Sequence, residues 1–481
     1  MADVQFFNII NDELRGSAAT ERVIDPRTEE PLWPWPVATT QDFEDAVAAA
    51  QRAFDGGWAR SSVAERQEKL KQLAEVLRAH SDELATILMR ESGKSRILAG
   101  IDVAGAIDQC LYYARPESAL QDEVQSDDER GRVVATHVPL GVVAAICPWN
   151  FPLILANMKV VSALVTGNCV IVKPSPFTPY AVTKWIELSR GIFPPGVLQV
   201  VNGGADIGAA MTEHPGIAKI TFTGTIATGK RVMAACARTL KKVTLELAGN
   251  DACVVCEDAD LDRAVPAVAS GGFFNAGQVC VASKRIYVHE KIYDAFLARL
   301  AREVQDRYAI QDDPYAPSVF GPLDNKLQYE TVKRLIEDCK AKGYEVVTGG
   351  ETQAVRPKGF WLPPTIVAKP PEDSPLVQEE QFGPILPVLS WSDEDDVIRR
   401  ANLANAGLGA SVYSSDLERA EHIARRLEAG SVWINHPERP NYAAFFGGIK
   451  DSGFGGEMGR QGLLSYSYTK CLHYPPKAAA A

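Results

Sequence analysis

The stretch VVAAICPWN, residues 142–150, is a short apolar run that ends in Pro, Trp and Asn. Four more short runs rich in β-branched residues follow it: CVIVKPS (169–175), LQVVNGG (198–204), KITFTGT (219–225) and KVTLELAG (242–249). Helical segments of about ten to fifteen residues lie between several of these runs. Because parallel strands need long crossovers, this alternation predicts an α/β fold in which helices wrap a parallel sheet.

Polar and small residues mark the ends of the predicted strands. They are Asn150, Lys173, Gly204, Gly224 and Glu246. In open parallel sheets, ligands bind at the carboxyl ends of the strands. We therefore expect functional residues at these ends.

The flanking sequence predicts helices before this sheet and a second α/β unit after it. Residues 38–123 have helical periodicity, with a Thr cap in TTQDFEDAVAAAQRAFDGGW (39–58) and two further long helices, from Arg66 to a stop at Gly93 and from Leu98 to Ala114. A second set of strands begins at DACVVCED (251–258) and extends to about residue 450; its other members are KRIYVHE (284–290), YEVVTGG (344–350), ILPVLSW (385–391), GASVYSS (409–415) and GSVWIN (430–435). The terminal LSYSYTKCLHYPP (464–476) predicts a strand without a local partner, which suggests pairing with another subunit.

The composition narrows the class of protein. A chain of 481 residues exceeds what one hydrophobic core serves, so two or three domains are expected. The formal net charge of −11 disfavours a nucleic-acid partner, and no segment has the apolar length of a membrane span or the apolar core of a signal peptide. We expect a cytosolic small-molecule enzyme with reduced cysteines and no metal site, because Cys253 and Cys256 fit a buried strand.

Three strand-end side chains have two interpretations each. Glu246 is either a carboxylate bonded to backbone amides or a general base with a raised pKa. Asn150, between two prolines, is either a turn residue or a donor to an oxyanion. Lys173 is either solvated or bound to a ribose or phosphate, and the turn containing Gly224 and Gly229 is weak support for a phosphate site.

Cys280 lies in FFNAGQVCVAS (273–283), a stretch of small, apolar and amide-bearing residues without a charge. A cysteine in such a setting is usually an inert thiol, because reactivity needs a lowered pKa or a nearby base. No histidine close to it in the sequence offers that activation. The stretch alone favours a buried filler residue.

Seven motifs follow one another between residues 148 and 453: PWNFP, KPS, FTGT, LELAG, FNAGQVC, EEQFGP and FGGIKDSG. In this order they resemble the aldehyde dehydrogenase superfamily over essentially the whole chain. The resemblance implies a Rossmann-like cofactor domain, a second α/β catalytic domain and a small β oligomerisation element. The corresponding ranges are 1–120 with 140–248, then 249–451, and 121–139 with 465–481. It also implies a homodimer or homotetramer.

In that family, the cysteine of the FNAGQVC motif, here Cys280, attacks the aldehyde. Asn150 and the backbone N–H of Cys280 would hold the oxyanion, and hydride would pass to the nicotinamide to leave a thioester. Glu246 would activate the water that hydrolyses it, which argues against transfer to coenzyme A. Ala276 and Gly277 are then interpreted as leaving room for cofactor and substrate beside the sulfur.

The resemblance also implies a set of cofactor-binding residues. They are Trp149, Lys173, Ser175, Gly204, Gly208, Gly224, Thr225, Glu380 and Phe382. The cofactor is NAD or NADP, with NAD slightly favoured. Many NAD-selective relatives have Glu three residues after the lysine, where it bonds the adenosine ribose, whereas this chain has Pro176. The choice between the two cofactors therefore stays open.

The substrate pocket implied by the resemblance has walls from two segments. Its residues are Phe151, Leu155, Met158 and, in HPERPNYAAFF (436–446), Glu438, Arg439 and Phe446. Apolar and aromatic walls favour a hydrophobic aldehyde. Glu438 and Arg439 are interpreted as solvated rim charges; alternatively, Arg439 binds a substrate carboxylate.

The predicted function is NAD(P)-dependent oxidation of an aldehyde to a carboxylic acid. One alternative is a dehydrogenase specific for an aromatic aldehyde or a carboxylated semialdehyde. A more remote alternative is a non-catalytic scaffold that retains the fold.

Overall fold

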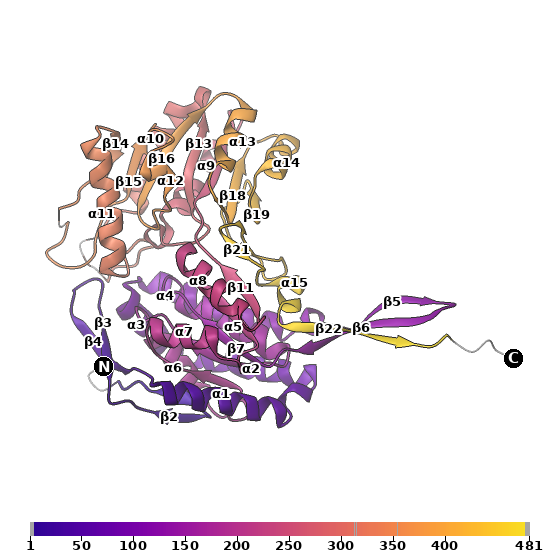
Figure 1. Cartoon of the computed structure of the whole chain (residues 1–481). Helices are drawn as coiled ribbons and strands as arrows, with labels where there is room; N and C mark the ends of the chain where they lie inside the picture. Colours follow the sequence, from indigo (N-terminus) through magenta and orange to yellow (C-terminus); the bar gives the residue numbers. More distant parts are fainter. Residues whose placement is uncertain (1–3, 312, 314, 354, 477–481) are drawn as a thin grey trace.

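The computed structural model describes residues 4–311, 313, 315–353 and 355–476, and Figure 1 shows two α/β units and a projecting arm. The first sheet has eight strands. In spatial order they are β2 (Glu13–Arg15), β1 (Asn8–Ile10), β9 (Leu198–Val200), β8 (Cys169–Lys173), β7 (Val142–Ile146), β10 (Lys219–Thr223), β11 (Lys242–Glu246) and β21 (Gly453–Phe454). The five central strands are parallel and are those predicted from the sequence, so the α/β class is confirmed.

Eight helices belong to this part of the chain. They are α1 (Thr40–Asp55), α2 (Val63–Ala79), α3 (Ser81–Ser92), α4 (Arg96–Tyr113), α5 (Pro152–Val165), α6 (Tyr180–Leu188), α7 (Ala205–Glu213) and α8 (Ile226–Ala237). The predicted cap of α1 is present, because the Thr39 side chain accepts from the Asp42 N–H. The single helix predicted after Arg66 is wrong, since α2 ends at Ala79 and α3 begins at Ser81, with His80 as the residue between them. Gly93 ends α3 in the left-handed conformation, as predicted.

The second sheet has seven strands. In spatial order they are β14 (Glu345–Thr348), β15 (Thr365–Ala368), β16 (Ile385–Trp391), β13 (Ser283–His289), β12 (Asp251–Val255), β18 (Gly409–Tyr413) and β19 (Ser431–Ile434). All neighbours are parallel except β14 with β15. The helices that follow are α9 (Leu261–Phe273), α10 (Tyr293–Arg307), α11 (Lys326–Ala341), α12 (Pro375–Gln378), α13 (Glu394–Asn402) and α14 (Leu417–Arg426).

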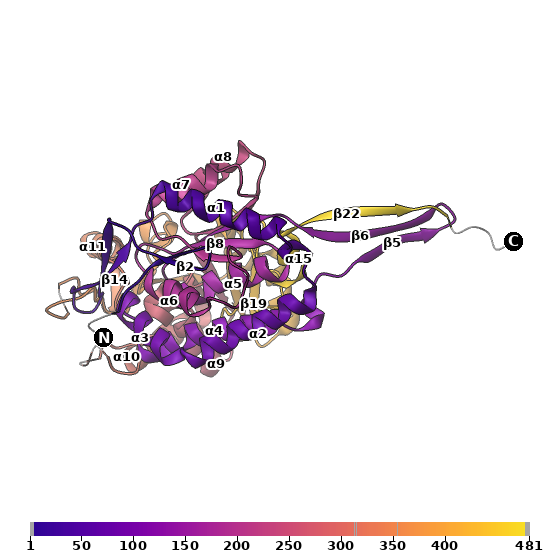
Figure 2. The same ribbon diagram turned by 90° about the horizontal axis from the view of Figure 1, so that it is seen from below.

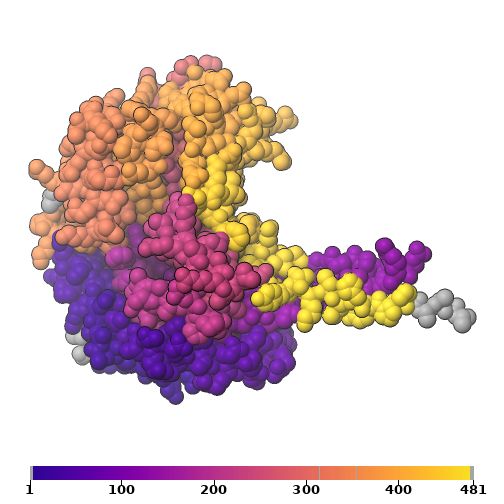
Figure 3. All heavy atoms as spheres, in the orientation of Figure 1, coloured from indigo at the N-terminus to yellow at the C-terminus, as the bar shows by residue number. Residues whose placement is uncertain are grey.

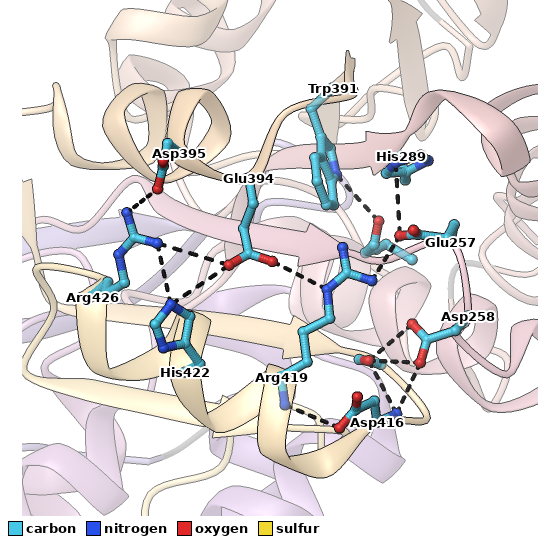
Figure 4. Close-up of polar contacts among 12 residues, drawn as sticks. Glu257, Asp258, His289, Trp391, Glu394, Asp395, Asp416, Arg419, His422 and Arg426 are labelled. Atoms are coloured by element: carbon cyan, nitrogen blue, oxygen red, sulfur yellow. Dashed lines mark hydrogen bonds and ion pairs between the residues drawn. The ribbon is translucent and has the colours of Figure 1, made fainter.

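The carboxyl ends of strands in the first sheet face the amino ends of strands in the second sheet. The carboxyl ends of β10 and β11, at Gly224 and Glu246, line a cavity together with Ala248 and Cys280, which precede the amino ends of β12 and β13. The opposite, carboxyl edge of the second sheet holds polar side chains that pair with one another, as Figure 4 shows. Arg419, for example, donates to Glu257 at 2.9 Å and to Glu394 at 3.1 Å. The second unit therefore contributes to the cavity through its amino edge.

The arm is a three-stranded antiparallel sheet of β5 (Glu123–Asp128), β6 (Gly131–Pro139) and β22 (Ser467–Tyr474). It stands clear of the body of the molecule (Figures 1, 2 and 3). The last strand, β22, has no local partner, as predicted, but it pairs within its own chain, with β6 over all eight of its residues. That partner lies more than three hundred residues earlier, beyond the reach of a local pattern. Residues 477–481 of the predicted element lie outside the described residues.

Smaller elements complete the fold. They are the hairpin of β3 (Thr20–Ile24) and β4 (Pro31–Pro36), the pair β17 (Ala406–Gly407) and β20 (Ile449–Lys450), and α15 (Gly459–Leu464), which leads into β22. Within the described ranges, no helix combines the length and the apolar character needed to cross a membrane.

Candidate active site

Two cavities meet at Cys280 and Asn150, which line both of them. The first, of about 380 Å³, lies between α4, α5 and residues 437–446. The second, of about 340 Å³, lies between the ends of β10 and β11, the start of α11 and the segment 380–382. Seven of the other cysteines are buried and Cys471 is exposed, whereas Cys280 is partly exposed at this junction. The arrangement brings a thiol within reach of two separate ligands.

A left-handed turn positions Cys280. Asn275, Ala276 and Gly277 all have positive φ, at 54°, 54° and 72°. The Gln278 side chain holds the turn by donating to the Asn275 carbonyl at 2.9 Å, while its Oε1 accepts from the Asp324 N–H at 2.9 Å. Two non-glycine residues in this conformation cost free energy, and strained backbone of this kind is concentrated at functional sites.

The small residues in this turn serve its packing. A β-carbon at Gly277 would lie 2.4 Å from the Gly383 carbonyl oxygen and 2.5 Å from the Lys284 Nζ. Gly277 and Ala276 are both buried and line neither cavity. The prediction that they leave room for cofactor and substrate is therefore wrong, because neither lines these cavities and a larger residue at Gly277 would meet neighbouring protein atoms.

Glu246 is buried beside the Cys280 sulfur at the end of β11. Its Oε2 accepts from the Thr223 hydroxyl at 3.0 Å, and no hydrogen bond to Oε1 occurs within the described residues. Burial raises the pKa of Glu246 above its usual range. Burial, and then the neighbouring Glu246, raises the pKa of the Cys280 thiol. An ionised Glu246 therefore makes ionisation of Cys280 less favourable.

A buried polar network lies behind Glu246. Lys159 donates to the Thr221 hydroxyl at 3.0 Å and to Glu457 at 3.4 Å, and the Tyr466 hydroxyl donates to Glu457 at 2.8 Å. The Lys159 charge partly offsets the effect of burial on the pKa of Glu246. The pKa of Glu246 therefore depends on charged and polar groups of β10, α5 and the residues before α15.

Asn150 has the position expected of a donor to an oxyanion. It lies between β7 and α5, is buried, and its Nδ2 donates to the Gln278 carbonyl at 3.1 Å. Gln278 is only two residues before Cys280, so the amide group and the sulfur approach the same point from different sheets. An oxygen atom next to the sulfur can take the place of that carbonyl as acceptor.

The second cavity contains five of the predicted cofactor residues. They are Trp149, Gly224, Thr225, Glu380 and Phe382. The rings of Trp149 and Phe382 meet edge to face at 5.2 Å, and Glu380 Oε1 accepts from the Gly249 N–H at 2.9 Å. Thr225 caps α8, whose first-turn N–H groups face this side and favour an anion. Burial raises the pKa of Glu380 to about 8. This donor set fits a dinucleotide, with phosphate at the start of α8.

The other four predicted cofactor residues lie outside the lining of this cavity. Lys173 ends β8 and is buried, its Nζ donates to the Pro174 carbonyl at 3.2 Å, and burial lowers its pKa to about 8. Gly204 precedes α7, and a β-carbon at Gly208 would lie 3.7 Å from the Lys173 side chain. Ser175 accepts from the N–H of Phe177, a residue that does line the cavity. The four form a neighbouring group around the end of β8.

The first cavity contains all six predicted substrate residues. They are Phe151, Leu155, Met158, Glu438, Arg439 and Phe446. The rings of Phe151 and Phe274 stack at 6.2 Å, and the remaining lining is mostly apolar. Such a wall accommodates an apolar or aromatic group better than a strongly hydrated one.

The interpretation of Glu438 as a solvated rim charge is wrong. Its side chain passes under α9, where Oε1 accepts from the Ser283 hydroxyl and Oε2 is enclosed without a partner among the described residues. A β-carbon at Gly271 of α9 would lie 2.5 Å from that oxygen, and burial raises the pKa of Glu438. Arg439 is exposed, as that interpretation required.

Several lining residues had no signal in the sequence. They are Ile101 and Gln109 from α4, Phe177, Phe274, and Asn325, Leu327, Gln328 and Thr331 around the start of α11. Gln328 donates to the carbonyls of Gln381 and Phe382 at 2.9 and 3.1 Å. On their own helices these residues look like ordinary surface positions, so only the packing of the helices places them at the site.

Comparisons with known proteins agree with this geometry. A family model described as "Aldehyde dehydrogenase family" matches residues 14–472. The putative aldehyde dehydrogenase FUS7 of Gibberella fujikuroi is 43% identical over 468 residues, which are 97% of this chain and 98% of that protein. Aldehyde dehydrogenase LUC3 of Fusarium sp. is 41% identical over the same shares of the two chains.

Solved structures share the whole fold. An NAD⁺ complex of an aldehyde dehydrogenase from Bacillus cereus superposes with a TM-score of 0.94 at 34% identity, covering 98% of this chain and 97% of that one. A structure of lactaldehyde dehydrogenase gives a TM-score of 0.93 at 32% identity, with 98% and 99% covered.

Proposed function

The chain belongs to the aldehyde dehydrogenase family, and we propose that it oxidises an aldehyde to a carboxylic acid through a thioester on Cys280, with Glu246 as the base of the hydrolytic step. The observation that carries the proposal is the junction of the two cavities. There the Cys280 sulfur, the Asn150 amide and the Glu246 carboxyl lie around one point that substrate and cofactor reach from opposite sides.

The first half-reaction begins at Cys280. The Cys280 thiol releases its proton to solvent, the thiolate adds to the aldehyde carbon so that a C–S bond forms, and the carbonyl oxygen becomes an alkoxide. Asn150 Nδ2 and the Cys280 backbone N–H donate to that oxygen, a contribution of about 3–4 kcal/mol for one such donor. When bound, NAD or NADP supplies the acceptor for the hydride that leaves the substrate carbon. Loss of that hydride restores the C=O bond and leaves a thioester.

Glu246 acts in the second half-reaction. Its unpaired Oε1 accepts a proton from a water molecule, the oxygen of that water adds to the thioester carbon, and the C–S bond breaks to return Cys280 as thiolate. A raised pKa suits this task, because a base whose pKa lies closer to neutrality both accepts and releases the proton. The same carboxyl is the neighbour that raises the pKa of Cys280, so the two groups titrate as a pair.

The choice between NAD and NADP follows from the group around β8. Lys173 ends that strand, Ser175 follows it, and Pro176 occupies the position from which a carboxylate would repel a 2′-phosphate. We propose that both cofactors are used, with NAD preferred, and that the arm joins subunits into a dimer or tetramer. Exposed apolar side chains on the arm, among them Val124, Leu472 and Tyr474, support the second point.

Rapid mixing tests the mechanism with the variants E246Q and C280A. The E246Q variant should produce a burst of about one NADH per site and then a steady rate about 10²–10⁴-fold below wild type. C280A should bind cofactor normally and give neither burst nor turnover. The matched control is C339A, which removes a buried cysteine outside both cavities. Turnover by C280A above that of a heat-inactivated sample would refute the proposal.

The mostly apolar lining of the first cavity supports an apolar or aromatic aldehyde as substrate. Arg439 favours a second class, aldehydes that carry a carboxylate. Arg439 is exposed at the wall of this cavity, and none of the hydrogen bonds and ion pairs found among the described residues involves its side chain. A panel of aliphatic, aromatic and carboxylated aldehydes, assayed with wild type and R439M, separates the two. A rise in KM confined to carboxylated substrates would favour the second class.

A further inference from the structure

A third cavity lies at the root of the arm and shares no lining residue with the two cavities at Cys280. Its volume is about 180 Å³, and we call it the root cavity. It lies between the start of α2, the turn after α5, and the strands β6 and β22. Its polar lining residues are Arg66, Asp122, His137, Thr166 and Ser467. Figure 2 shows the arm leaving the body of the molecule beside α15.

Arg66 is an almost fully buried cation that forms no ion pair within the described residues. The residue lies on the first turn of α2 and is 8% exposed, and its enclosed Nε has no hydrogen-bond partner among the described residues. Glu65, on the same turn, forms no ion pair with it, but its charge partly offsets the effect of burial on the pKa of Arg66. Burial lowers the pKa of Arg66, but an arginine side chain keeps its charge in proteins. A buried charge is strongly unfavourable unless it is paired.

The fold makes room for this guanidinium. A β-carbon at Gly167 would lie 2.0 Å from the Arg66 Nη1, and Gly167 has φ of 86°, which disfavours any other residue. The turn that contains Gly167 is itself anchored, because the next side chain, Asn168, accepts from the N–H groups of Leu140 and Gly141 at 2.7 and 3.0 Å. The position of Arg66 is therefore built into the fold.

His137 is a second unpaired donor at the same cavity. Both ring nitrogens are enclosed, and neither has a partner in the described part of the chain. The hydroxyls nearby are already used as donors, Thr166 to the Ser162 carbonyl at 2.7 Å and Ser467 to the Leu464 carbonyl at 3.2 Å. The start of α2 also lines the cavity through Val63, so helix N–H groups add to the positive potential.

We propose that the root cavity binds a small tetrahedral oxyanion, either inorganic phosphate or the phosphoryl group of a small metabolite, between Arg66 and His137. A planar guanidinium with several N–H groups matches the oxygens of a phosphoryl group. Arg66 belongs to α2 and His137 to β6, so the bound anion links the body of the molecule to the arm. Asp122, exposed at the cavity, opposes this charge and sets how tightly the anion is held.

Titration calorimetry on the full chain tests the site. Saturating NAD⁺ keeps the start of α8 occupied, and phosphate is compared with chloride at equal ionic strength. Wild type should show one saturable site, and R66M should bind about tenfold or more weakly, since a charge-assisted hydrogen bond is lost. D122N should bind more tightly. Glycerol 3-phosphate in place of phosphate distinguishes a phosphoryl group from the free ion by which of the two binds more tightly.

The matched control is R78M, the same substitution at an exposed position on the same helix, which should bind phosphate like wild type. Thermal unfolding gives a second measurement: saturating phosphate should raise the wild-type midpoint by about 2–4 °C and leave that of R66M unchanged. If R66M does not fold, H137N and D122N must still shift the affinity in opposite directions. Absence of saturable binding to wild type, or equal affinity in R66M, would overturn the proposal.

Discussion

Replacing Lys94 by Met should damage both the stability and the chemistry of this enzyme, because one buried ion pair supports the start of α5. Lys94 Nζ lies 2.6 Å from Asp102 Oδ2, and both side chains are almost completely buried. Asp102 Oδ1 accepts from the Ile154 N–H at 2.8 Å, and Lys94 Nζ lies 4.2 Å from the centre of the Phe151 ring. α5 has no cap of its own, since Phe151 provides no side-chain hydrogen bond to it.

The magnitude follows from the burial of the pair. Removing one partner of a buried ion pair leaves an uncompensated charge and costs about 3–5 kcal/mol. At about 2–4 °C for each kcal/mol, the unfolding midpoint of K94M should fall by roughly 6–20 °C. Asn150 is only four residues before Ile154, so a small shift of this helix start also moves the oxyanion donor. A misplacement of about 1 Å lowers kcat by roughly 10²-fold.

The double variant K94M/D102L separates stability from positioning. It removes both charges, and an apolar replacement of a buried pair is often neutral, so most of the lost stability should return. The Ile154 N–H, which keeps its acceptor in K94M, loses it through D102L, so kcat should stay low. Unfolding midpoints, cofactor affinity and kcat are measured side by side with K342M, which breaks an exposed pair and should change each very little. Full recovery of kcat in the double variant would refute the positioning role.

Three further predictions concern single groups. The C471A substitution removes the exposed cysteine, so that alkylation reports on Cys280. At pH 8, Cys280 in C471A/E246Q should react faster with iodoacetamide than Cys280 in C471A, because the carboxyl that raises the thiol pKa is gone; an equal or slower rate contradicts this. P176E should raise the ratio of kcat/KM for NAD to that for NADP, and an unchanged ratio would mean that other groups control the choice. Burial gives the Glu438 carboxyl a higher pKa in the folded than in the unfolded state, so the protonated carboxyl stabilises the fold at low pH and this contribution is lost as pH rises. We therefore expect the free energy of unfolding of E438Q to fall less than that of wild type between pH 5 and 9 in urea titrations.

The sequence pattern predicted the five parallel strands of the first sheet because each is short, apolar and followed by a turn. It also placed Asn150, Lys173 and Glu246 at their ends, where the structure has them. It missed β15, TIVA at 365–368, which is flanked by prolines and shorter than a typical strand. The break between α2 and α3 was also missed, since the amphipathic period continues through His80 although the helix does not.

Side-chain burial was less predictable than strand order. Glu438 has the local surroundings of a loop charge, and only the passage of its loop beneath α9 encloses its carboxyl group. The pairing of β22 with β6 has the same origin, because the register depends on two segments separated by most of the chain. Patterns within a window of a few residues contain no information on such contacts.

Cys280 shows why the reactive atom was the hardest part of the site to find from physical reasoning alone. Ligand sites are expected at the carboxyl ends of parallel strands, and that rule leads to Asn150 and Glu246 in the first sheet. Cys280 instead precedes β13, at the amino edge of the second sheet, and reaches the site through a turn with three consecutive positive φ angles. Asn150 and Glu246, which assist it, therefore belong to another sheet, so its role follows only from how the two sheets face each other.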